Sequence, residues 1–370
     1  MIAVLLYAFI AVFFIQLVYY LGFFSKFSFD NATKKTDFTA TFPVSIIICA
    51  KNEADNLIKN LPYIYNQNYS NFQVVLINDD SSDNTLDVME EFELKHPNTK
   101  IVNVKSVEAF WGKKKYALTL GIKAAQHEHL VFTDADCKPI SENWLPLICN
   151  QFSAQKQIIL GYGGYQRKKK SLLNALIRFE TVLTAIQYFS FAKLGKPYMG
   201  VGRNLAYTKS IFFEAKGFMT HMDILSGDDD LFVNQNAEEK NTAIIHHQES
   251  FTISTPKDTW KKWRLQKRRH VTTANHYKST DQFKLGLFYS SQILFFLLAI
   301  SLLINLYQWI VVVAIILIRE LVFYLVVGKA AQKLQEKYLI WALPFYEIAL
   351  IFFQFTIFIH NLFSKPTHWK

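Results

Sequence analysis

Apolar segments at both ends of the chain constrain its fold more than any other feature of the sequence. Residues 1–24 are nearly all aliphatic or aromatic, and a second apolar block covers residues 285–328. A run of about 20 apolar residues is long enough to cross the hydrocarbon core of a bilayer as a helix. No small-residue cleavage site follows the first segment, so it predicts a spanning helix and not a signal peptide.

The order of these segments predicts a membrane topology. Polar and interfacial residues at 305–309 interrupt the second block, which indicates a helical hairpin, and residues 338–363 form a further apolar segment. Lys26 follows the first segment and Lys329 follows the hairpin, so the positive-inside rule predicts that the intervening domain is cytosolic. The count implies four spans, whereas the basic tail 364–370 favours a re-entrant last segment, and this topology stays open.

Charged residues interrupt the C-terminal apolar segments. Arg319 and Glu320 lie inside the hairpin and Glu347 inside the last segment, and a charge at the bilayer centre costs roughly 2.5–3.5 kcal/mol on insertion scales. Arg319 is nine residues before Gly328, and Glu347 is nine residues after Tyr338. In antiparallel helices these positions have similar depth, which predicts an Arg319–Glu347 ion pair. The alternative is that the helices are shifted and both charges reach an interface.

The charge balance narrows the classes of ligand. The chain has 40 Lys and Arg against 30 Asp and Glu, a net charge of +10. With membrane segments present, this excess favours anionic lipid headgroups and nucleotide diphosphates. No motif for nucleic-acid binding is present, so we expect no nucleic-acid partner. Cys49, Cys137 and Cys149 show no metal-ligand spacing and no disulfide framework, which suits a reducing compartment.

Between the apolar ends, short β-branched runs alternate with segments of helical periodicity. Continuous apolar runs of this kind are typical of buried parallel strands. Strands are predicted at 44–49, 73–78, 101–104 and 130–133, and helices at 54–65, 82–94 and 115–126. Ser82 or Asp83 is placed to cap the second helix. The alternation predicts an α/β domain with an open, mostly parallel sheet, which binds its ligand beyond the carboxyl ends of the strands.

Two carboxylates follow the fourth predicted strand. Asp134 and Asp136 are separated by one residue, at the point where this strand enters a loop. Hard oxygen ligands in this arrangement can hold Mg²⁺ or Mn²⁺ against a diphosphate. The ion would neutralise charge on a departing nucleoside diphosphate. A solvated turn is the alternative for such a pair, but the preceding strand favours the metal site.

Two further acidic clusters are candidates for binding and catalysis. Asp79 and Asp80 end the second predicted strand, where a carboxylate can hydrogen-bond a base or ribose, or else form a capping turn. Asp228, Asp229 and Asp230 form a run in which repulsion raises at least one pKa, as a general base requires. The same run suits the first turn of a helix, and the two roles are compatible.

Two segments combine basic and apolar residues. Residues 260–270 carry tryptophans together with Gln266, Arg269 and His270. They predict either a basic helix on the membrane surface or a contact between Arg269 and the pyrophosphate of a donor. Residues 171–194 are amphipathic and follow the basic run 167–170, which predicts an interface helix beside anionic headgroups or, alternatively, a core helix.

Together these residues resemble the membrane-bound family 2 glycosyltransferases, which have a GT-A fold and include ceramide glucosyltransferase-like and polysaccharide synthase-like members. The resemblance covers roughly residues 43–270 and the flanking spans, and it rests on the order and spacing of four motifs. These are the run 44–53, the pair Asp79-Asp80, the segment 112–118 that leads to Asp134-Ala-Asp136, and the acidic run 227–231.

The resemblance implies a role for each matched residue. Donor contacts are implied for Ala50, Asn52, Glu53, Asp79, Asp80, Lys115, Asp134, Gln266 and Arg269. Within this set, Asp80 matches the aspartate that contacts uridine, and Asp134 with Asp136 matches the metal ligands. Counting back from Leu231 puts the catalytic base at Asp228, with Asp229 as the fallback and Gly227 where the family has glutamate.

The sequence departs from the family at one position. The Gln-x-x-Arg-Trp motif appears here as Gln266, Arg269 and His270. In polymer-making members the tryptophan resembles a platform for the acceptor sugar, so His270 argues against processive polymerisation. The small membrane portion also leaves little room for a polysaccharide channel. Arg203 stands where members place acceptor-side residues, and it is predicted to contact a phosphate or to lie in a structural turn.

These observations predict an inverting, metal-dependent transfer of a sugar from a nucleotide-diphosphate donor, a UDP-sugar by resemblance, to a lipid or lipid-linked acceptor. The chain is predicted to be an integral membrane protein, in the cytoplasmic membrane of a bacterium, with a cytosolic catalytic domain. The predicted parts are a spanning helix 1–25, a GT-A domain 42–255, an amphipathic interface segment 256–284 and transmembrane helices 285–363. Two alternatives remain, a processive polysaccharide synthase and a non-catalytic nucleotide-sensing membrane scaffold.

Overall fold

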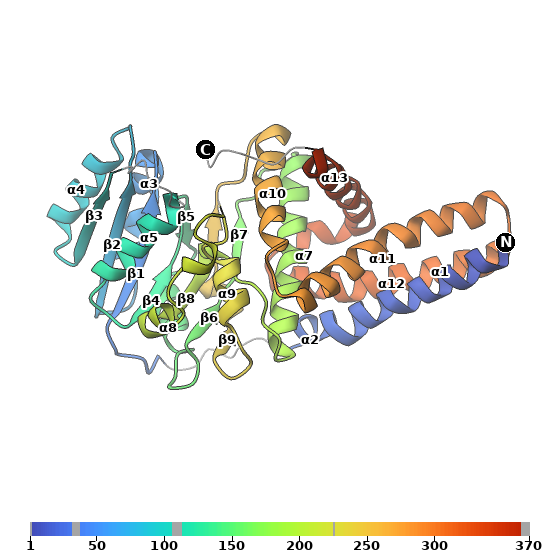
Figure 1. The fold of residues 1–370 in the computed structure, drawn as a ribbon, viewed down its shortest axis with the longest axis horizontal. Helices are drawn as coiled ribbons and strands as arrows, with labels where there is room; N and C mark the ends of the chain where they lie inside the picture. The colour runs from blue at the N-terminus through green and yellow to red at the C-terminus, as the bar shows by residue number, and fades with distance from the viewer. Residues whose placement is uncertain (1, 32–37, 106–112, 225, 364–370) are drawn as a thin grey trace. The chain divides into compact units, whose positions relative to one another are not determined.

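The computed structural model describes residues 2–31, 38–105, 113–224 and 226–363 (Figure 1). The chain divides into two compact units. The membrane unit consists of Met1–Asn31, Lys168–Leu194 and Thr259–Pro366. The sheet unit consists of Ala32–Arg167, Gly195–Asp258 and Thr367–Lys370.

A seven-stranded mixed sheet forms the centre of the sheet unit. Its strands lie in the order β3 (Thr99–Val104), β2 (Phe72–Asp79), β1 (Val44–Ala50), β4 (His129–Phe132), β8 (Leu205–Thr208), β6 (Ile158–Leu160) and β9 (Thr242–Ile244). The first four are parallel neighbours, whereas β8 runs antiparallel to β4 and β6. The predicted α/β fold with a mostly parallel sheet is confirmed, and the carboxyl ends of the parallel strands share one edge.

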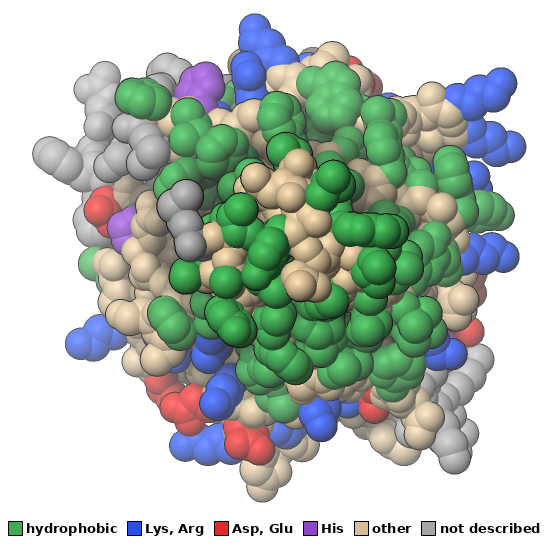
Figure 2. All heavy atoms as spheres, turned by 90° about the vertical axis from the view of Figure 1, so that its right-hand side faces the viewer, with side chains coloured by type: hydrophobic (Ala, Val, Ile, Leu, Met, Phe, Trp, Pro, Cys, Tyr) green, Lys and Arg blue, Asp and Glu red, His purple; other side chains and the backbone are tan. Residues whose placement is uncertain are grey.

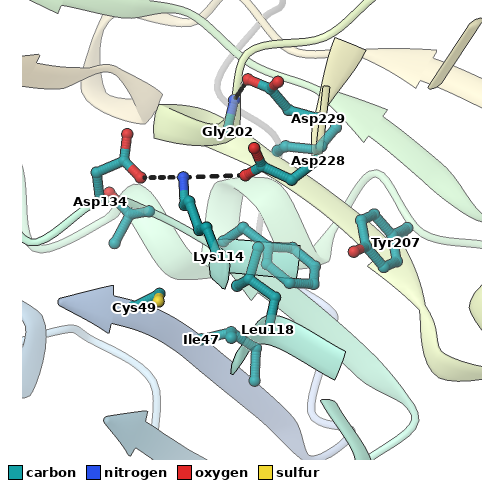
Figure 3. A pocket seen from close by; sticks show the side chains of 12 residues that line it. Ile47, Cys49, Lys114, Leu118, Asp134, Gly202, Tyr207, Asp228 and Asp229 are labelled. Atoms are coloured by element: carbon teal, nitrogen blue, oxygen red, sulfur yellow. Dashed lines mark hydrogen bonds and ion pairs between the residues drawn. The ribbon is translucent and has the colours of Figure 1, made fainter. Parts of the chain in front are cut away.

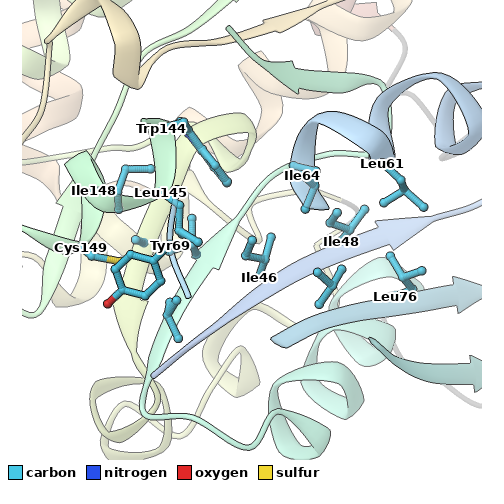
Figure 4. Close-up of a cluster of buried hydrophobic side chains, with 14 of the residues drawn as sticks. Ile46, Ile48, Leu61, Ile64, Tyr69, Leu76, Trp144, Leu145, Ile148 and Cys149 are labelled. Atoms are coloured by element: carbon cyan, nitrogen blue, oxygen red, sulfur yellow. The ribbon is translucent and has the colours of Figure 1, made fainter. Parts of the chain in front are cut away.

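Helices cover the parallel part of this sheet. α3 (Ala54–Tyr65) follows β1, α4 (Thr85–Lys95) follows β2, and α5 (Lys113–Ala124) precedes β4. Ile46 and Ile48 of β1 are buried beside Leu61 of α3 and Leu76 of β2 (Figure 4). Burial of each such side chain contributes about 1.5–3 kcal/mol, so the apolar runs that predicted the strands also supply the core.

A close approach holds α5 against the sheet. Gly121 lies on the face of α5 that meets β2, and a Cβ at this position would be 2.1 Å from Cδ1 of Ile77. A side chain at this position would have to displace Ile77 or the helix. The approach fixes the position of α5, whose first turn reaches the carboxyl edge of the sheet.

A smaller three-stranded sheet follows the end of β4. Its strands lie in the order β5 (Cys137–Pro139), β10 (Thr252–Ser254) and β7 (Gly163–Tyr165). The remaining helices of the sheet unit are α6 (Trp144–Cys149), α8 (Lys209–Glu214) and α9 (Asp230–Asn236). Because β5 starts directly after Asp136, this sheet anchors the loop that carries the two predicted metal ligands.

The membrane unit is built from long apolar helices. The N-terminal helix runs through α1 (Ile2–Leu17), a π-helical segment η1 (Val18–Phe24) and α2 (Ser25–Ser28). The C-terminal part contains α11 (Ser279–Ile304), α12 (Trp309–Lys333), the short helix η5 (Lys337–Ala342) and α13 (Leu343–Phe363). Four segments of the described residues are long and apolar enough to cross a membrane. Figure 2 shows hydrophobic side chains over the free ends of α1, α11 and α12.

Two further helices belong to the membrane unit. α7 (Leu172–Lys193) is capped by Ser171, whose hydroxyl accepts a hydrogen bond from the backbone N–H of Asn174 at 3.2 Å. α10 (Trp260–Ala274) contacts α7 through an ion pair between Lys267 and Glu180 at 2.6 Å. Most of α7 is buried, and it also forms an ion pair from Arg178 to Glu336. Of the two predictions for α7, the structure favours the packed helix.

The predicted ion pair between Arg319 and Glu347 is confirmed. Their side chains are 0% and 1% exposed, and the guanidinium contacts both carboxylate oxygens. Arg319 also donates to Gln16 at 2.7 Å and to Glu320 at 2.8 Å, and Glu347 accepts from Gln292 at 2.9 Å. Buried charges in a membrane helix are tolerated when they pair with one another, and this network joins α1, α11, α12 and α13.

Candidate active site

A cleft opens at the carboxyl edge of the seven-stranded sheet, where Figure 3 shows side chains from both parallel and antiparallel strands. The space measures about 340 Å³ and includes open solvent. Aliphatic and aromatic side chains form its floor, and acidic side chains with one lysine form its mouth. The lining residues are Ile47, Cys49, Lys114, Leu118, Phe132, Thr133, Asp134, Gly202, Leu205, Tyr207, Asp228 and Asp229.

Lys114 is the cation at the mouth of the cleft. Its Nζ lies 2.9 Å from Oδ2 of Asp228 and 3.3 Å from Oδ1 of Asp134 (Figure 3). Burial disfavours the charged form, but the two carboxylates outweigh that effect and hold the pKa of Lys114 well above its usual value. Lys114 therefore joins a predicted metal ligand to the predicted catalytic base.

Asp228 is presented by a turn that requires glycine. Gly227 has a φ of +96°, a conformation that residues with a Cβ rarely adopt. A Cβ there would also lie 2.4 Å from Cδ1 of Leu231. This explains why glycine stands where the resembling family has glutamate. Burial opposes ionisation of Asp228, yet Lys114 lowers the pKa of this carboxyl below its usual value.

Asp229 differs from Asp228 in its hydrogen-bond partners and in the direction of its pKa shift. Its Oδ2 accepts a hydrogen bond from the backbone N–H of Gly202 at 2.6 Å, and its Oδ1 accepts one from the N–H of Asp230 at 2.8 Å. Asp229 is thereby the N-cap of α9. Burial and the repulsion of Asp228 and Asp230 raise the pKa of Asp229 to about 7. The predicted helix-start role and a raised pKa thus occur in one residue.

The loop after β4 carries the predicted metal ligands. Ligand atoms of Asp134, Asp136 and Cys137 lie within 4.8 Å of one another. Asp136 also accepts a hydrogen bond from Ser254 at 3.1 Å, which fixes one of its oxygens. Burial and the nearby Asp134 raise the pKa of Asp136. Two carboxylates that repel each other in this way fit a hard divalent cation, because the ion would relieve their repulsion.

The ends of β1 and β2 form the other side of this edge. Asn52 and Asp80 both have positive φ, 55° and 53°, so each strand turns sharply just beyond its last residue. The two turns are bonded together, since the N–H of Asn52 donates to Ser81 at 3.0 Å and its Oδ1 accepts from the N–H of Ser82 at 2.8 Å. The side chain of Asp80 remains exposed.

The other donor residues predicted here have structural partners. The backbone oxygen of Asp79 accepts a hydrogen bond from Lys51 Nζ at 3.0 Å, and the N–H of Glu53 donates to Thr85 at 2.9 Å. Asp79 is buried and Ala50 is the last residue of β1. These residues lie at the predicted edge of the sheet, and their contacts to a donor stay predictions.

Lys115 is not among the residues that line the cleft. It is 2% exposed, and its Nζ donates to the backbone oxygens of His221 at 2.6 Å and Ile224 at 2.8 Å. Burial lowers the pKa of Lys115 to about 8. The lysine that lines the cleft is therefore Lys114, and the donor contact predicted for Lys115 has no support from its position. Gly112, the first residue of this motif, lies outside the described residues.

Arg203 lies beside the metal-binding loop. It belongs to a short 3₁₀ turn, Gly202–Asn204, and its guanidinium stacks on the ring of Tyr165 at 4.2 Å. It also donates to the backbone oxygen of Gly164 at 3.2 Å. Its position beside the small sheet agrees with the predicted structural turn, and contact with an acceptor stays a prediction. Gln266, Arg269 and His270 lie on α10, in the membrane unit.

Sequence reasoning missed Lys114 and Tyr207 as parts of the cleft. A signal for Lys114 was present, because Lys114 and Leu118 are four residues apart and therefore share a face of α5. Leu118 continues into Gly121 and Ile122, the face that packs on the sheet. Tyr207 carried no such signal, since its position depends on the antiparallel strand β8.

Residues 45–220 match the sequence model of the family described as glycosyl transferase family 2. Among curated proteins, the chain is 27% identical over 143 residues to the cholesterol galactosyltransferase of Borreliella burgdorferi, covering 37% of this chain and 38% of that protein. It is 26% identical over 193 residues to the 4,4'-diaponeurosporenoate glycosyltransferase of Staphylococcus haemolyticus, covering 51% and 50%. The matched part is about a third to a half of the length of the curated relatives.

Two other proteins extend the comparison. The poly-beta-1,6-N-acetyl-D-glucosamine synthase of Staphylococcus epidermidis is 33% identical over 93 residues, covering 25% of this chain and 21% of that protein. The solved structure of the mannosyltransferase PcManGT from Pyrobaculum calidifontis, in complex with GDP-Man and Mn²⁺, has a TM-score of 0.61. It is 16% identical and covers 94% of this chain and 99% of that chain, which establishes similarity of fold.

Proposed function

We propose a reaction for this chain from the premise that residues 45–220 are a family 2 glycosyltransferase domain with a GT-A fold, as the sequence motifs predicted. The reaction is the inverting transfer of a sugar from a nucleotide-diphosphate sugar, a UDP-sugar by family resemblance, to a lipid or lipid-linked acceptor. One observation carries the proposal. Lys114 contacts both Asp134 and Asp228, so a metal ligand and a base candidate face the same cleft.

The donor would bind along the edge formed by the ends of β1, β2 and β4. Its nucleoside would meet the turns at Asn52 and Asp80, where exposed polar groups follow two parallel strands. Its diphosphate would approach Asp134 and Lys114. Lysine is suited to phosphate as a compact positive charge on a flexible stem, and Lys114 is 18% exposed at the mouth of the cleft.

A divalent cation fits the loop after β4. Asp134 and Asp136 would hold it, and hard oxygen ligands suit Mg²⁺ or Mn²⁺. When bound, such an ion neutralises the charge of a departing nucleoside diphosphate. A fold relative was solved with Mn²⁺, and the three neighbouring ligand atoms of Asp134, Asp136 and Cys137 support a site at this loop.

Asp228 is the proposed base. It takes the proton of an acceptor hydroxyl, whose oxygen attacks the anomeric carbon while the bond from that carbon to the diphosphate oxygen breaks. A single displacement inverts the anomeric centre, so an α-linked donor gives a β-glycoside. Asp229 is the alternative base, because a pKa of about 7, raised by burial and its acidic neighbours, is well matched to proton abstraction at neutral pH.

The acceptor is proposed to come from the membrane. Four helices among the described residues are long and apolar enough to span a bilayer, and two curated relatives are named cholesterol galactosyltransferase and 4,4'-diaponeurosporenoate glycosyltransferase. Lys26, Lys329 and Lys333 flank these helices, which by the positive-inside rule favours a cytosolic catalytic unit. Arg203 and His270 stay candidates for the acceptor side, and Gln266 and Arg269 for the donor.

The proposal is tested with matched variants of the two aspartates. Purified protein in native lipid extract is offered a panel of nucleotide sugars, and products are identified by mass spectrometry. Asp228→Asn should lower turnover by about 100-fold or more, the range for loss of a general base, while donor binding measured by calorimetry is retained. Asp229→Asn keeps a capping side chain and should lose less. The opposite ranking would move the base to Asp229, and turnover unchanged in both would defeat the assignment.

A processive polysaccharide synthase is the second candidate. The 33% identity to a poly-beta-1,6-N-acetyl-D-glucosamine synthase over 93 residues supports it, whereas His270 in place of the family's tryptophan opposes it. Product length separates the two reactions. Single additions to a lipid support the first candidate, and a ladder of products with one acceptor supports the second.

A further inference from the structure

The last apolar helix, α13, follows a course that its composition does not reveal. Residues Lys337–Asn361 are long and apolar enough to span a bilayer. We call the end of the helix bundle that carries Lys26, Lys284, Lys329 and Lys333 the basic end. α2, the start of α11 and the end of α12 all lie at this end. The contacts of α13 show which end it reaches.

The chain enters the bundle from the basic end through η5, so the start of α13 already lies inside the bundle. Leu343 lies beside Gly328 near the end of α12, where a Cβ added to the glycine would be 3.8 Å from Cδ1 of Leu343. Glu347 then reaches Arg319, deeper in α12, and accepts from Gln292 of α11 at 2.9 Å. At this point α13 is inside the apolar part of the bundle.

From its start, α13 runs back toward the basic end. The backbone oxygen of Ile351 accepts from the hydroxyl of Tyr289 at 3.4 Å. Tyr289 is three residues closer to the start of α11 than Gln292, which is about 4.5 Å along the helix axis. From Glu347 to Ile351, α13 has therefore moved back toward the end at which α11 begins.

The remainder of α13 packs on α10, which precedes α11 in the chain. Phe353 stacks on Trp263 with ring centroids 3.9 Å apart and an interplanar angle of 5°. Near its end, Asn361 accepts from Nε of Arg268 at 2.7 Å. Both partners belong to a helix with a strongly basic sequence, Trp260–Ala274. A helix that crossed the bilayer would end far from such a helix.

The opposite half of the bundle is built without α13. Its buried cluster consists of Phe9, Val12, Phe13, Phe295, Ala299, Leu302 and Val312, all from α1, α11 and α12. In the part of the chain that the structure describes, no residue of α13 joins this cluster or the side chains packed against it. Figure 1 shows α13 beside α10 and steeply inclined to α1, α11 and α12.

We propose that α13 does not cross the membrane but lies within the leaflet at the basic end, and that with α10 it forms a surface for the lipids of that leaflet. One face of α13 packs inside the unit through Tyr346, Glu347, Leu350 and Ile357. The other face exposes a stripe at helical spacing, Phe345, Ile348, Phe352, Phe355 and Ile359. Such a stripe suits the acyl chains just below the headgroups.

The positive charge of α10 indicates which lipids this surface would bind. α10 exposes Lys261 and Arg264 beside the α13 contact, and basic side chains at a membrane surface attract anionic headgroups. Three helices then cross the bilayer, and α13 ends at the basic end, the end at which the chain leaves α2. This inference rests on the packing of the helices and is independent of the proposed reaction.

Tag accessibility in sealed vesicles tests the topology. One variant of the full chain carries an epitope tag after Lys370, and a second carries the same tag between Leu306 and Tyr307, in the turn that joins α11 to α12. Protease is added to vesicles of known orientation. We expect the C-terminal tag to be digested whenever the sheet unit is digested, and the turn tag to be protected. Digestion of both tags together, with the sheet unit protected, would overturn the proposal.

Spin labels test the depth of α13 directly. Phe345→Cys, Phe352→Cys and Ile359→Cys place labels at exposed positions of one face, and the first and last are about 21 Å apart along the helix. Labelled protein is placed in bilayers with phosphatidylglycerol or with phosphatidylcholine alone. We expect all three labels in the leaflet at the basic end, within about 15 Å of its surface, which is half the thickness of the hydrocarbon core, with deeper immersion in the anionic bilayer. Labels 345 and 359 near opposite surfaces would refute the in-plane course, and equal immersion in both bilayers would refute the headgroup preference.

Discussion

Removal of Arg319 should destabilise the membrane unit more than removal of any of its partners. The guanidinium of Arg319 interacts with two carboxylates: it contacts Glu347 and donates to Glu320 at 2.8 Å. Arg319→Met removes the only positive charge in this network and leaves both carboxylates at membrane depth. Glu347→Gln should destabilise the unit less, because Arg319 stays paired with Glu320 and the glutamine keeps a hydrogen-bond acceptor.

The magnitudes follow from burial. Loss of one partner from a buried ion pair costs about 3–5 kcal/mol, and two stranded carboxylates place Arg319→Met at the upper end of that range. Glu347→Gln should cost about 1.5–3 kcal/mol, the range for a hydrogen bond to a charged group. The double variant Arg319→Met/Glu347→Leu removes the pair together. Replacement of a buried pair by apolar groups is often neutral or stabilising, so it should be more stable than Arg319→Met.

The assay is equilibrium unfolding in mixed micelles with increasing SDS, which gives differences in the free energy of unfolding between variants. Glu320→Gln is the matched control, because its side chain is 22% exposed and Glu347 still neutralises Arg319. It should change the free energy by less than about 1 kcal/mol, as for a partly exposed pair. The reasoning fails if Arg319→Met costs no more than Glu347→Gln, or if the double variant is the least stable.

Three further predictions concern the sheet unit. Asp136→Ala should abolish metal-dependent transfer measured with added Mn²⁺, and full wild-type activity in excess EDTA would reject a metal role. The free energy of unfolding should fall as pH rises from about 4 to 7, because burial and acidic neighbours raise the pKa of Asp229 in the folded protein to about 7. In a series of unfolding curves at different pH, Asp229→Asn should flatten that decline. His221 acts in the opposite direction, since burial and Lys115 lower its pKa to about 4, so stability should fall as pH drops below about 6.5. His221→Gln should remove that loss. If the variant lost as much stability at acid pH as the wild type, a buried neutral imidazole at His221 would not be its cause.

The sequence was sufficient where a local pattern decides the structure. The apolar runs at 44–49 and 73–78 became β1 and β2, and the helix predicted at 54–65 is α3 with the same bounds. In these strands the continuous apolar pattern of the sequence agrees with the observed burial, because a strand covered on both faces must be apolar throughout. The order of the acidic motifs also followed, since strand ends in a parallel sheet meet at one edge.

Long-range pairing was beyond the reach of the sequence. The antiparallel strand β8 brings Gly202 and Tyr207 to the cleft, and Ser254 reaches Asp136 across 118 positions. Each of these contacts depends on strand order and not on a local pattern. The course of α13 was open for a similar reason, because a helix that crosses a membrane and one that lies within a leaflet can have the same composition.

Arg319 and Lys114 each interact with two carboxylates, but the two side chains differ in how firmly they are held. Arg319 is fully buried and its planar fork engages Glu347 through two nitrogens, an arrangement that a ligand cannot reach and that favours a fixed position. Lys114 holds Asp134 and Asp228 with a single ammonium at the mouth of an open cleft. Its flexible stem would let it change partners if a phosphate or a metal ion bound there, as the proposed reaction requires. Arg319 therefore fastens helices in the membrane unit, whereas Lys114 is the contact that the proposed reaction would have to exchange.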